Sequence, residues 1–203
     1  MTSASDRSLP SIPEPFQIAR DLPPGNYRLT DVFGGFQEVP PYSKYPIERR
    51  KLTRLVEQTR VQVLPERVWM YVAPHEAPPW AAKYGWKPFT TSENCIVVGR
   101  THLSKSASLV LYLDILHEFC HIIQRHNGRE LWDISNGYVG SPTELEAYRF
   151  CLAEARRLGV TDAFLRRYLK VGWVQGRDHH KLLRNLGVKP SRRRSRPRSR
   201  PNA

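Results

Sequence analysis

The chain lacks long hydrophobic runs. Charged residues interrupt its apolar stretches well before the ~20 residues that are needed to cross a bilayer. The opening segment, MTSASDRSLP, also lacks the apolar run of a secretory signal. We therefore expect a soluble, cytoplasmic protein with no membrane partner.

Cysteine is scarce as well. Cys95, Cys120 and Cys151 are odd in number and show no close pairing pattern, which fits a reducing compartment better than a disulfide framework. We expect none of them to have a functional role, and we expect Cys120 to be a buried thiol rather than a metal ligand.

Acidic residues are outnumbered by basic ones, and the formal net charge is +13. Seven basic residues and no acidic residue lie between Lys189 and Arg200, so this short segment supplies about half of the imbalance. Its composition predicts a disordered tail over 188–203. Two interpretations stay open: a solubilising tail, or sequence-independent contact with nucleic-acid phosphates.

The length of 203 residues, 40% of them hydrophobic, suits one domain with appended segments. Residues 1–45 are rich in proline and predict an extended arm, and 46–187 predict the domain itself. Within it, periodicity and composition predict helices and strands as follows: a helix over 46–64, strands over 68–72 and 95–99, a central helix over 104–125, and further helices over 141–158, 162–170 and 179–186. The fold class is therefore α+β, with a small β-sheet followed by a helical C-terminal part.

The central helix is apolar around most of its circumference, and its polar residues form a single stripe. The stripe contains Asp114, His117, Glu118, His121 and Arg125. An unpaired charge in a protein core costs several kcal/mol, so these groups need partners, a metal ion or water. We expect the stripe to face a cleft.

Within this stripe, His117-Glu118-Phe119-Cys120-His121 has the spacing of a metal site. His117 and His121 lie one turn apart on the same helix face, so both imidazoles can reach one tetrahedral metal while Glu118 stands beside them as a base. A catalytic zinc site needs a third protein ligand and leaves a fourth position for water. The motif therefore predicts metal-activated hydrolysis.

The third ligand distinguishes the known classes of such enzymes. Metzincins require a glycine and a histidine where this chain has Gln124 and Asn127. The segment Glu144-Leu145-Glu146-Ala147-Tyr148-Arg149-Phe150, however, resembles the second motif of glutamate-zincins, most closely that of ImmA/IrrE-type metallopeptidases.

This resemblance covers roughly Pro46 to Leu158 and implies a zincin-like domain with a buried HExxH helix. In the family motif the ligand glutamate stands three residues before an alanine, here Ala147, so the resemblance implies zinc bound by His117, His121 and Glu144. The chain departs from the family at Tyr148, where an Asn or Asp usually supports a ligand histidine. Asp114 or Tyr148 itself are the candidates for that supporting role.

The residues alone do not establish that Glu144 is the third ligand. Ser141 and Glu144 also have the spacing of a capping box, in which the glutamate only bonds the helix N-terminus. Glu146 is the alternative ligand, and it points about 200° away from Glu144 around the helix, so only one of the two can face the metal.

The resemblance implies a zinc-dependent endopeptidase that cleaves a regulatory protein, with Glu118 as general base. Tyr138, Tyr148 and His126 are candidates by position for stabilising the transition state. We also expect the 95–99 strand to be an edge strand that binds an extended peptide.

Two alternatives stay open. One is a nucleic-acid-associated zincin similar to SprT-type proteases, whose third ligand is a later histidine, for which His179 and His180 are the distant candidates. The other is a non-catalytic binding module with the zincin shape.

Overall fold

The computed structural model describes residues 9–133, 135, 137–174 and 176–189. The fold is α+β, with a small sheet and several helices, as the sequence predicts. Residues 190–203, which hold most of the predicted disordered tail, lie outside the described residues.

The main sheet has four strands in the order β2-β4-β6-β5. β4 and β6 are parallel, and the two outer strands run antiparallel to their neighbours. β6 has the predicted bounds, but it is an internal strand with every residue buried, so the prediction that it forms the edge is wrong and the edge next to it is β5. The bounds are Gly25–Arg28 (β2), Arg60–Leu64 (β4), Met70–Val72 (β5) and Cys95–Gly99 (β6).

The predicted helix over 46–64 is shorter in the structure. α2 spans Arg49–Gln58, and the next residues form β4. Val61 and Val63 are buried, and the residues between and around them are half-buried. This alternation has the period of a strand, and the two β-branched side chains favour it, so the helical periodicity ends at Thr59.

The proline-rich N-terminal segment packs into the same hydrophobic core as the rest of the chain. β2 joins the main sheet, and β1 pairs with β3 in a separate two-stranded sheet. The large side chains of this segment provide the driving force, because burying one aromatic ring stabilises the fold by about 1.5–3 kcal/mol. Those that are buried are Phe16, Phe33, Phe36, Tyr42 and Tyr45. Its remaining elements are Gln17–Ile18 (β1), Leu29–Val32 (α1), Phe33–Gly34 (β3), and the 3-10 turns Phe36–Glu38 (η1) and Pro40–Lys44 (η2).

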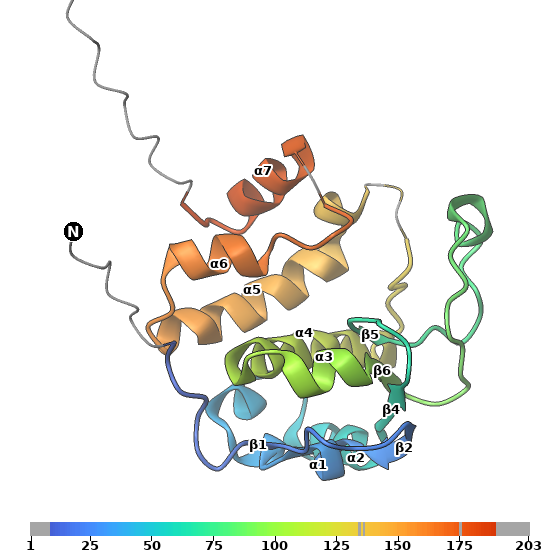
Figure 1. The fold of residues 1–203 in the computed structure, drawn as a ribbon, viewed down its shortest axis with the longest axis vertical. Helices are drawn as coiled ribbons and strands as arrows, with labels where there is room; N and C mark the ends of the chain where they lie inside the picture. The colour runs from blue at the N-terminus through green and yellow to red at the C-terminus, as the bar shows by residue number, and fades with distance from the viewer. Residues whose placement is uncertain (1–8, 134, 136, 175, 190–203) are drawn as a thin grey trace, which may run out of the picture.

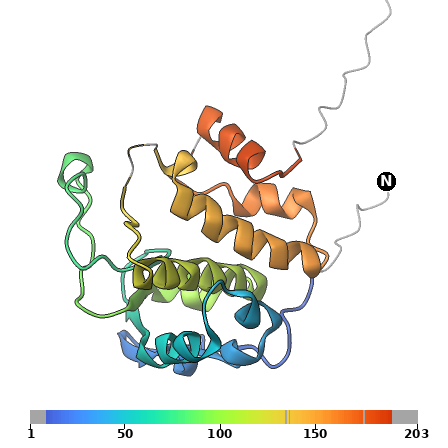
Figure 2. The ribbon, with the colours of Figure 1, turned by 180° about the vertical axis from the view of Figure 1, so that it is seen from behind.

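The helix α4 runs through the middle of the molecule, between the N-terminal elements and α5, with α6 and α7 on the outer side of α5 (Figures 1 and 2). The predicted 104–125 helix is divided in two near Ser106, and the three later helices form where the sequence predicts them. The bounds are Arg100–Lys105 (α3), Ser108–His126 (α4), Pro142–Arg157 (α5), Asp162–Tyr168 (α6) and Gly176–Asn185 (α7), with 3-10 turns at Ala82–Tyr84 (η3) and Tyr138–Gly140 (η4).

The 73–94 loop extends from the body of the molecule (Figures 1 and 2) and is irregular apart from η3. It meets the loop that follows α4 through tryptophans. The Trp80 Nε1 donates to the Trp132 carbonyl at 2.9 Å, and the Trp80 and Trp86 rings stack with their centroids 5.3 Å apart. The two loops are therefore joined at this point.

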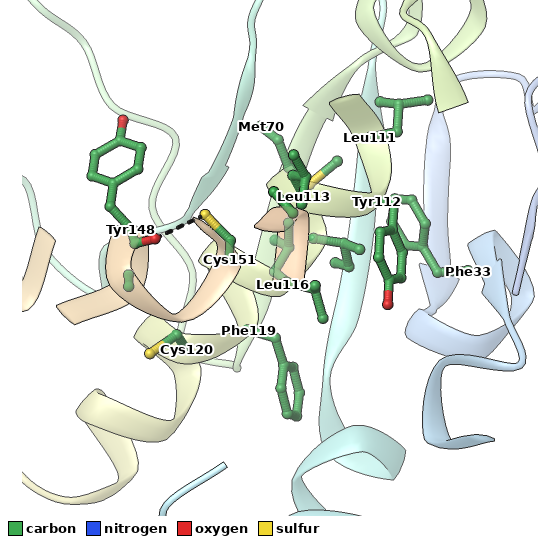
Figure 3. Close-up of a cluster of buried hydrophobic side chains, with 14 of the residues drawn as sticks. Phe33, Met70, Leu111, Tyr112, Leu113, Leu116, Phe119, Cys120, Tyr148 and Cys151 are labelled. Atoms are coloured by element: carbon green, nitrogen blue, oxygen red, sulfur yellow. Dashed lines mark hydrogen bonds between the residues drawn. The ribbon is translucent and has the colours of Figure 1, made fainter. Parts of the chain in front are cut away.

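α4 is buried on nearly all sides, as its composition predicts. Figure 3 shows part of the cluster around it. The Phe119 ring makes edge contacts with Phe36 and Tyr45, at centroid distances of 5.0 and 5.5 Å. On the other side α4 packs on α5, whose buried face carries small residues at every fourth position, namely Ala147, Cys151 and Ala155.

Cys95, Cys120 and Cys151 are free and buried, so the predicted absence of a disulfide framework is confirmed among the described residues. No described helix has an apolar stretch long enough to span a lipid bilayer.

The core position of Phe119 gives a first prediction. We expect Phe119→Ala to lower the free energy of unfolding by about 3–5 kcal/mol, because the change leaves a cavity between α4 and the N-terminal segment. Phe89→Ala is the matched control: that ring is 38% exposed, and its loss should cost about 0.5 kcal/mol or less. Urea unfolding followed by circular dichroism measures both. Equal losses would contradict this packing.

Candidate metal centre

Three ionisable side chains converge between α4 and α5. The His117 Nε2 and His121 Nε2 lie 3.1 Å apart, and the Glu144 carboxylate oxygens lie 3.4 and 3.5 Å from them. The two histidines come from successive turns of α4, and Glu144 comes from the first turn of α5. All three are buried or half-buried.

These separations fit a metal ion. In a tetrahedral site with metal–ligand distances of about 2.0–2.1 Å, neighbouring ligand atoms lie roughly 3.3–3.4 Å apart. The two imidazole nitrogens, and each of them with its nearer Glu144 oxygen, lie within a few tenths of an ångström of that value, and one ligand atom from each residue lies within 4.8 Å of the others. The group could therefore hold a metal ion.

Hydrogen bonds to Gln124 determine which ring nitrogen of His121 carries the proton. The Gln124 amide nitrogen donates to the Thr143 carbonyl at 3.1 Å and to the Glu146 carboxylate at 3.0 Å, and both of these atoms are acceptors. The Gln124 Oε1 therefore faces the His121 Nδ1, 2.7 Å away, and this ring nitrogen must be the donor. The Nε2 of the neutral imidazole then carries a lone pair that points at the shared centre, as a metal ligand requires.

Unsatisfied polar atoms support the same conclusion. The buried Glu144 Oε2 has no hydrogen-bond partner among the described residues. Leaving a buried polar atom without a partner costs about 1–3 kcal/mol. A bound cation would remove this cost.

Glu118 stands beside the cluster without joining it. Its Oε2 accepts a hydrogen bond from the Val72 backbone N–H at 3.0 Å, so the edge strand β5 holds it in place. Burial raises the pKa of this carboxyl to about 8. A carboxyl with such a pKa can exchange protons near neutral pH.

The electrostatics of the cluster favour one negative and one positive partner. Burial alone would raise the pKa of Glu144, but His121 and His117 hold it far below its usual range. Burial alone would lower the pKa of His121, but Glu144 and Glu118 raise it to about 9. The pKa of His117 stays below its usual value because burial outweighs its contact with Glu144. Without a metal, Glu144 is thus ionised and His121 is protonated at neutral pH.

A cavity of about 390 Å³ opens beside the centre and is lined by His117, Glu118 and Asp114 of the polar stripe. The expectation that the stripe faces a cleft therefore holds for these three residues. Tyr138 and Tyr148 also line the cavity, and their hydroxyl groups lie 2.7 Å apart. Burial raises the pKa of both tyrosines well above the usual value, so they keep their protons.

The Tyr148 ring lies against His117, with centroids 4.3 Å apart. In Figure 3 this side chain points away from the cluster around Leu113 and Leu116. The His117 Nδ1 has no hydrogen-bond partner among the described residues, so Tyr148 supports this histidine by packing and not by a hydrogen bond to that nitrogen.

The structure separates the two candidate glutamates. Glu146 pairs with Arg129 and Gln124 and lies outside the cluster, whereas Glu144 lies within it. The side chain of Ser141 makes no capping hydrogen bond, so the capping-box interpretation of Glu144 is not realised.

Other predicted site residues lie elsewhere. Asp114 accepts hydrogen bonds from His102 at 2.8 Å and Tyr168 at 2.9 Å, and so supports neither His117 nor His121. His126 is exposed at the end of α4 and does not line the cavity. His179 and His180 lie in α7 and do not belong to the cluster.

Two supporting groups were not predicted as part of the site. Gln124 follows His121 by three residues, a spacing that brings side chains together on a helix, and this signal was present in the sequence. The Val72 backbone N–H carries no side-chain signal, and its role depends on how β5 packs against α4.

Comparisons with protein-family models, with curated proteins and with solved structures found no match for this chain.

Protonation of His121 predicts how metal affinity depends on pH. A metal needs the neutral imidazole, so zinc binding at pH 7 should displace about one proton, and affinity should rise about tenfold per pH unit up to pH 9. Titration calorimetry in two buffers with different ionisation enthalpies counts the protons. His126→Ala should leave the count unchanged, and zinc uptake without proton release would contradict the prediction.

The support of His121 by Gln124 predicts a second effect. We expect Gln124→Ala to weaken zinc binding about 10-fold to 100-fold, because the His121 ring loses the acceptor that sets its tautomer and orientation. Competition with a chromophoric chelator measures the dissociation constant. Gln58→Ala, at an exposed position of α2, is the control and should bind zinc like the parent protein.

Proposed function

We propose that this chain is a zinc-dependent metallopeptidase with a zincin-like site, as its resemblance to ImmA/IrrE-type proteins implies. His117, His121 and Glu144 would hold the zinc ion. The observation that carries the proposal is the convergence of these three donor atoms beside a carboxyl group, that of Glu118, which is not part of the donor set.

The donor set favours zinc over harder cations. Two imidazole nitrogens and one carboxylate are a common protein ligand set for catalytic zinc, whereas magnesium and calcium take oxygen ligands. With three protein ligands, a fourth position is left for water. Zinc in such a site supplies a bound water whose pKa is about 7.

Glu118 is placed to handle the proton. Its carboxylate would take a proton from the attacking water and return it to the leaving amine. The raised pKa near 8 suits this exchange, because the group can both accept and release a proton near neutral pH. Tyr138 and Tyr148 keep their hydroxyl protons and line the same cavity, so either could donate to the oxyanion of the tetrahedral intermediate.

The edge strand offers a way to hold an extended substrate. The Trp69 carbonyl and the Ala73 N–H bond β6, so alternation along the strand turns the backbone groups of Met70 and Val72 away from β6. The Val72 N–H is already bonded to Glu118, next to the centre. A peptide lying along this edge would pass the metal, which favours a protein or peptide substrate.

The regulatory protein substrate, the contact of the 190–203 tail with nucleic acid and the cytoplasmic location stay predictions. No described histidine offers the later ligand of SprT-type proteases at this centre.

The test separates binding from catalysis. We expect Glu118→Gln to keep stoichiometric zinc but to lose about 10²-fold or more of its casein hydrolysis, because the proton acceptor is gone. Glu144→Ala should lose zinc, whereas Glu146→Ala should keep it, because this change removes only one of the two acceptors of the Gln124 amide and no candidate ligand. Elemental analysis and the release of acid-soluble peptide measure the two properties. Zinc binding without hydrolysis of any protein would instead favour the non-catalytic binding module.

A further inference from the structure

The cavity beside the metal centre is built mainly from apolar and aromatic side chains. Its volume of about 390 Å³ lies within the range of ligand-binding pockets, about 300–1,000 Å³. The walls come from separate parts of the chain, among them β5, α4, η4, α5, α6 and the segment after α6. Among the apolar lining residues are Met70, Val110, Phe164, Tyr168, Val171 and Trp173.

Two indole rings of this lining are exposed to solvent. Trp69, which precedes α4 in the chain, is 53% exposed. Trp173, which follows α6, is 56% exposed. Exposed large apolar side chains at a cavity indicate a binding site for apolar groups. Tryptophan is also among the residues that contribute most at recognition sites.

The charges of the lining favour an anionic group on whatever binds next to the cavity. Arg167, in α6, and Lys170, just after it, line the cavity and are exposed. Neither side chain has an acidic partner among the described residues. Asp114, in the same lining, accepts hydrogen bonds at both oxygens from His102 and Tyr168 and pairs with neither Arg167 nor Lys170.

The same hydrogen bonds fix the wall in place. The Tyr168 hydroxyl donates to Asp114, which ties α6 to α4, and the second Asp114 oxygen bonds His102 of α3. A pocket whose walls are ordered before binding loses less conformational entropy when a ligand enters.

We propose that this cavity takes a large apolar side chain from the substrate residue next to the cleaved bond, and that Arg167 and Lys170 select an acidic residue close to it. The inference rests on the proposed peptidase function. It follows from the shared lining, because His117 and Glu118 of the centre and the apolar wall belong to one cavity.

The experiment maps cleavage sites in a synthetic library of peptides with randomised central positions, read by mass spectrometry, with the zinc-loaded full chain. The parent protein should prefer Phe, Leu, Met or Trp over Ala at one position adjoining the cleaved bond by about 10-fold or more. It should also prefer acidic over basic residues nearby by about fivefold.

Variants test each part of the proposal. Val171→Trp, which fills the cavity, should shift the preference toward small side chains. The double change Arg167→Glu and Lys170→Glu should reverse the charge preference. Arg177→Glu with Lys181→Glu, exposed positions of α7 outside the cavity lining, is the matched control and should keep the parent specificity. Zinc content and thermal unfolding of each variant establish that it is folded.

The outcomes distinguish the two levels of inference. If no peptide is cleaved although zinc is bound, the peptidase function fails. If peptides are cleaved without an apolar preference, or if the preferences do not change in the variants, the peptidase function stands and the assignment of this cavity is overturned.

Discussion

The structure depends on the desolvation of ionisable groups on one buried helix. α4 carries His117, Glu118 and His121 in surroundings that are otherwise apolar, and each of these groups would destabilise the fold if it were left without a partner. The chain resolves this by bringing a carboxylate from α5 against the two imidazoles and a backbone N–H from β5 against Glu118. The packing of α5 and β5 on α4 therefore also assembles the candidate site.

This requirement accounts for the small residues on α5. Ala147 is fully buried, and a larger side chain there would hold α5 away from α4 and move Glu144 from the histidines. The Tyr45 hydroxyl donates to the Leu116 carbonyl at 3.0 Å, the Phe119 ring lies next to it, and the Tyr45 ring stacks on Phe150 of α5 with the centroids 4.1 Å apart. The N-terminal segment thus packs against both α4 and α5, which explains why it is integrated into the core.

The sequence predicts the parts of the fold that depend on local pattern, together with the candidate ligands of the HExxH motif and the segment that follows it. The bounds of β6 and α5 follow from β-branched residues and from a proline at the helix start, and the candidate ligands follow from their spacing. It did not predict β4 or the position of β6 within the sheet, because a short apolar run does not indicate which strands will lie beside it. Nor could it choose between Glu144 and Glu146 by pattern alone, since the choice depends on which face of α5 meets α4.

The two histidines of the centre are supported in different ways. The Tyr148 ring packs on His117 without a hydrogen bond to the Nδ1 of that histidine. The hydrogen-bonded support falls instead on His121, through Gln124 and its contacts with Thr143 and Glu146 on α5. Glu146 therefore contributes to the centre through Gln124, and the same turn of α5 supplies both the ligand candidate and its support.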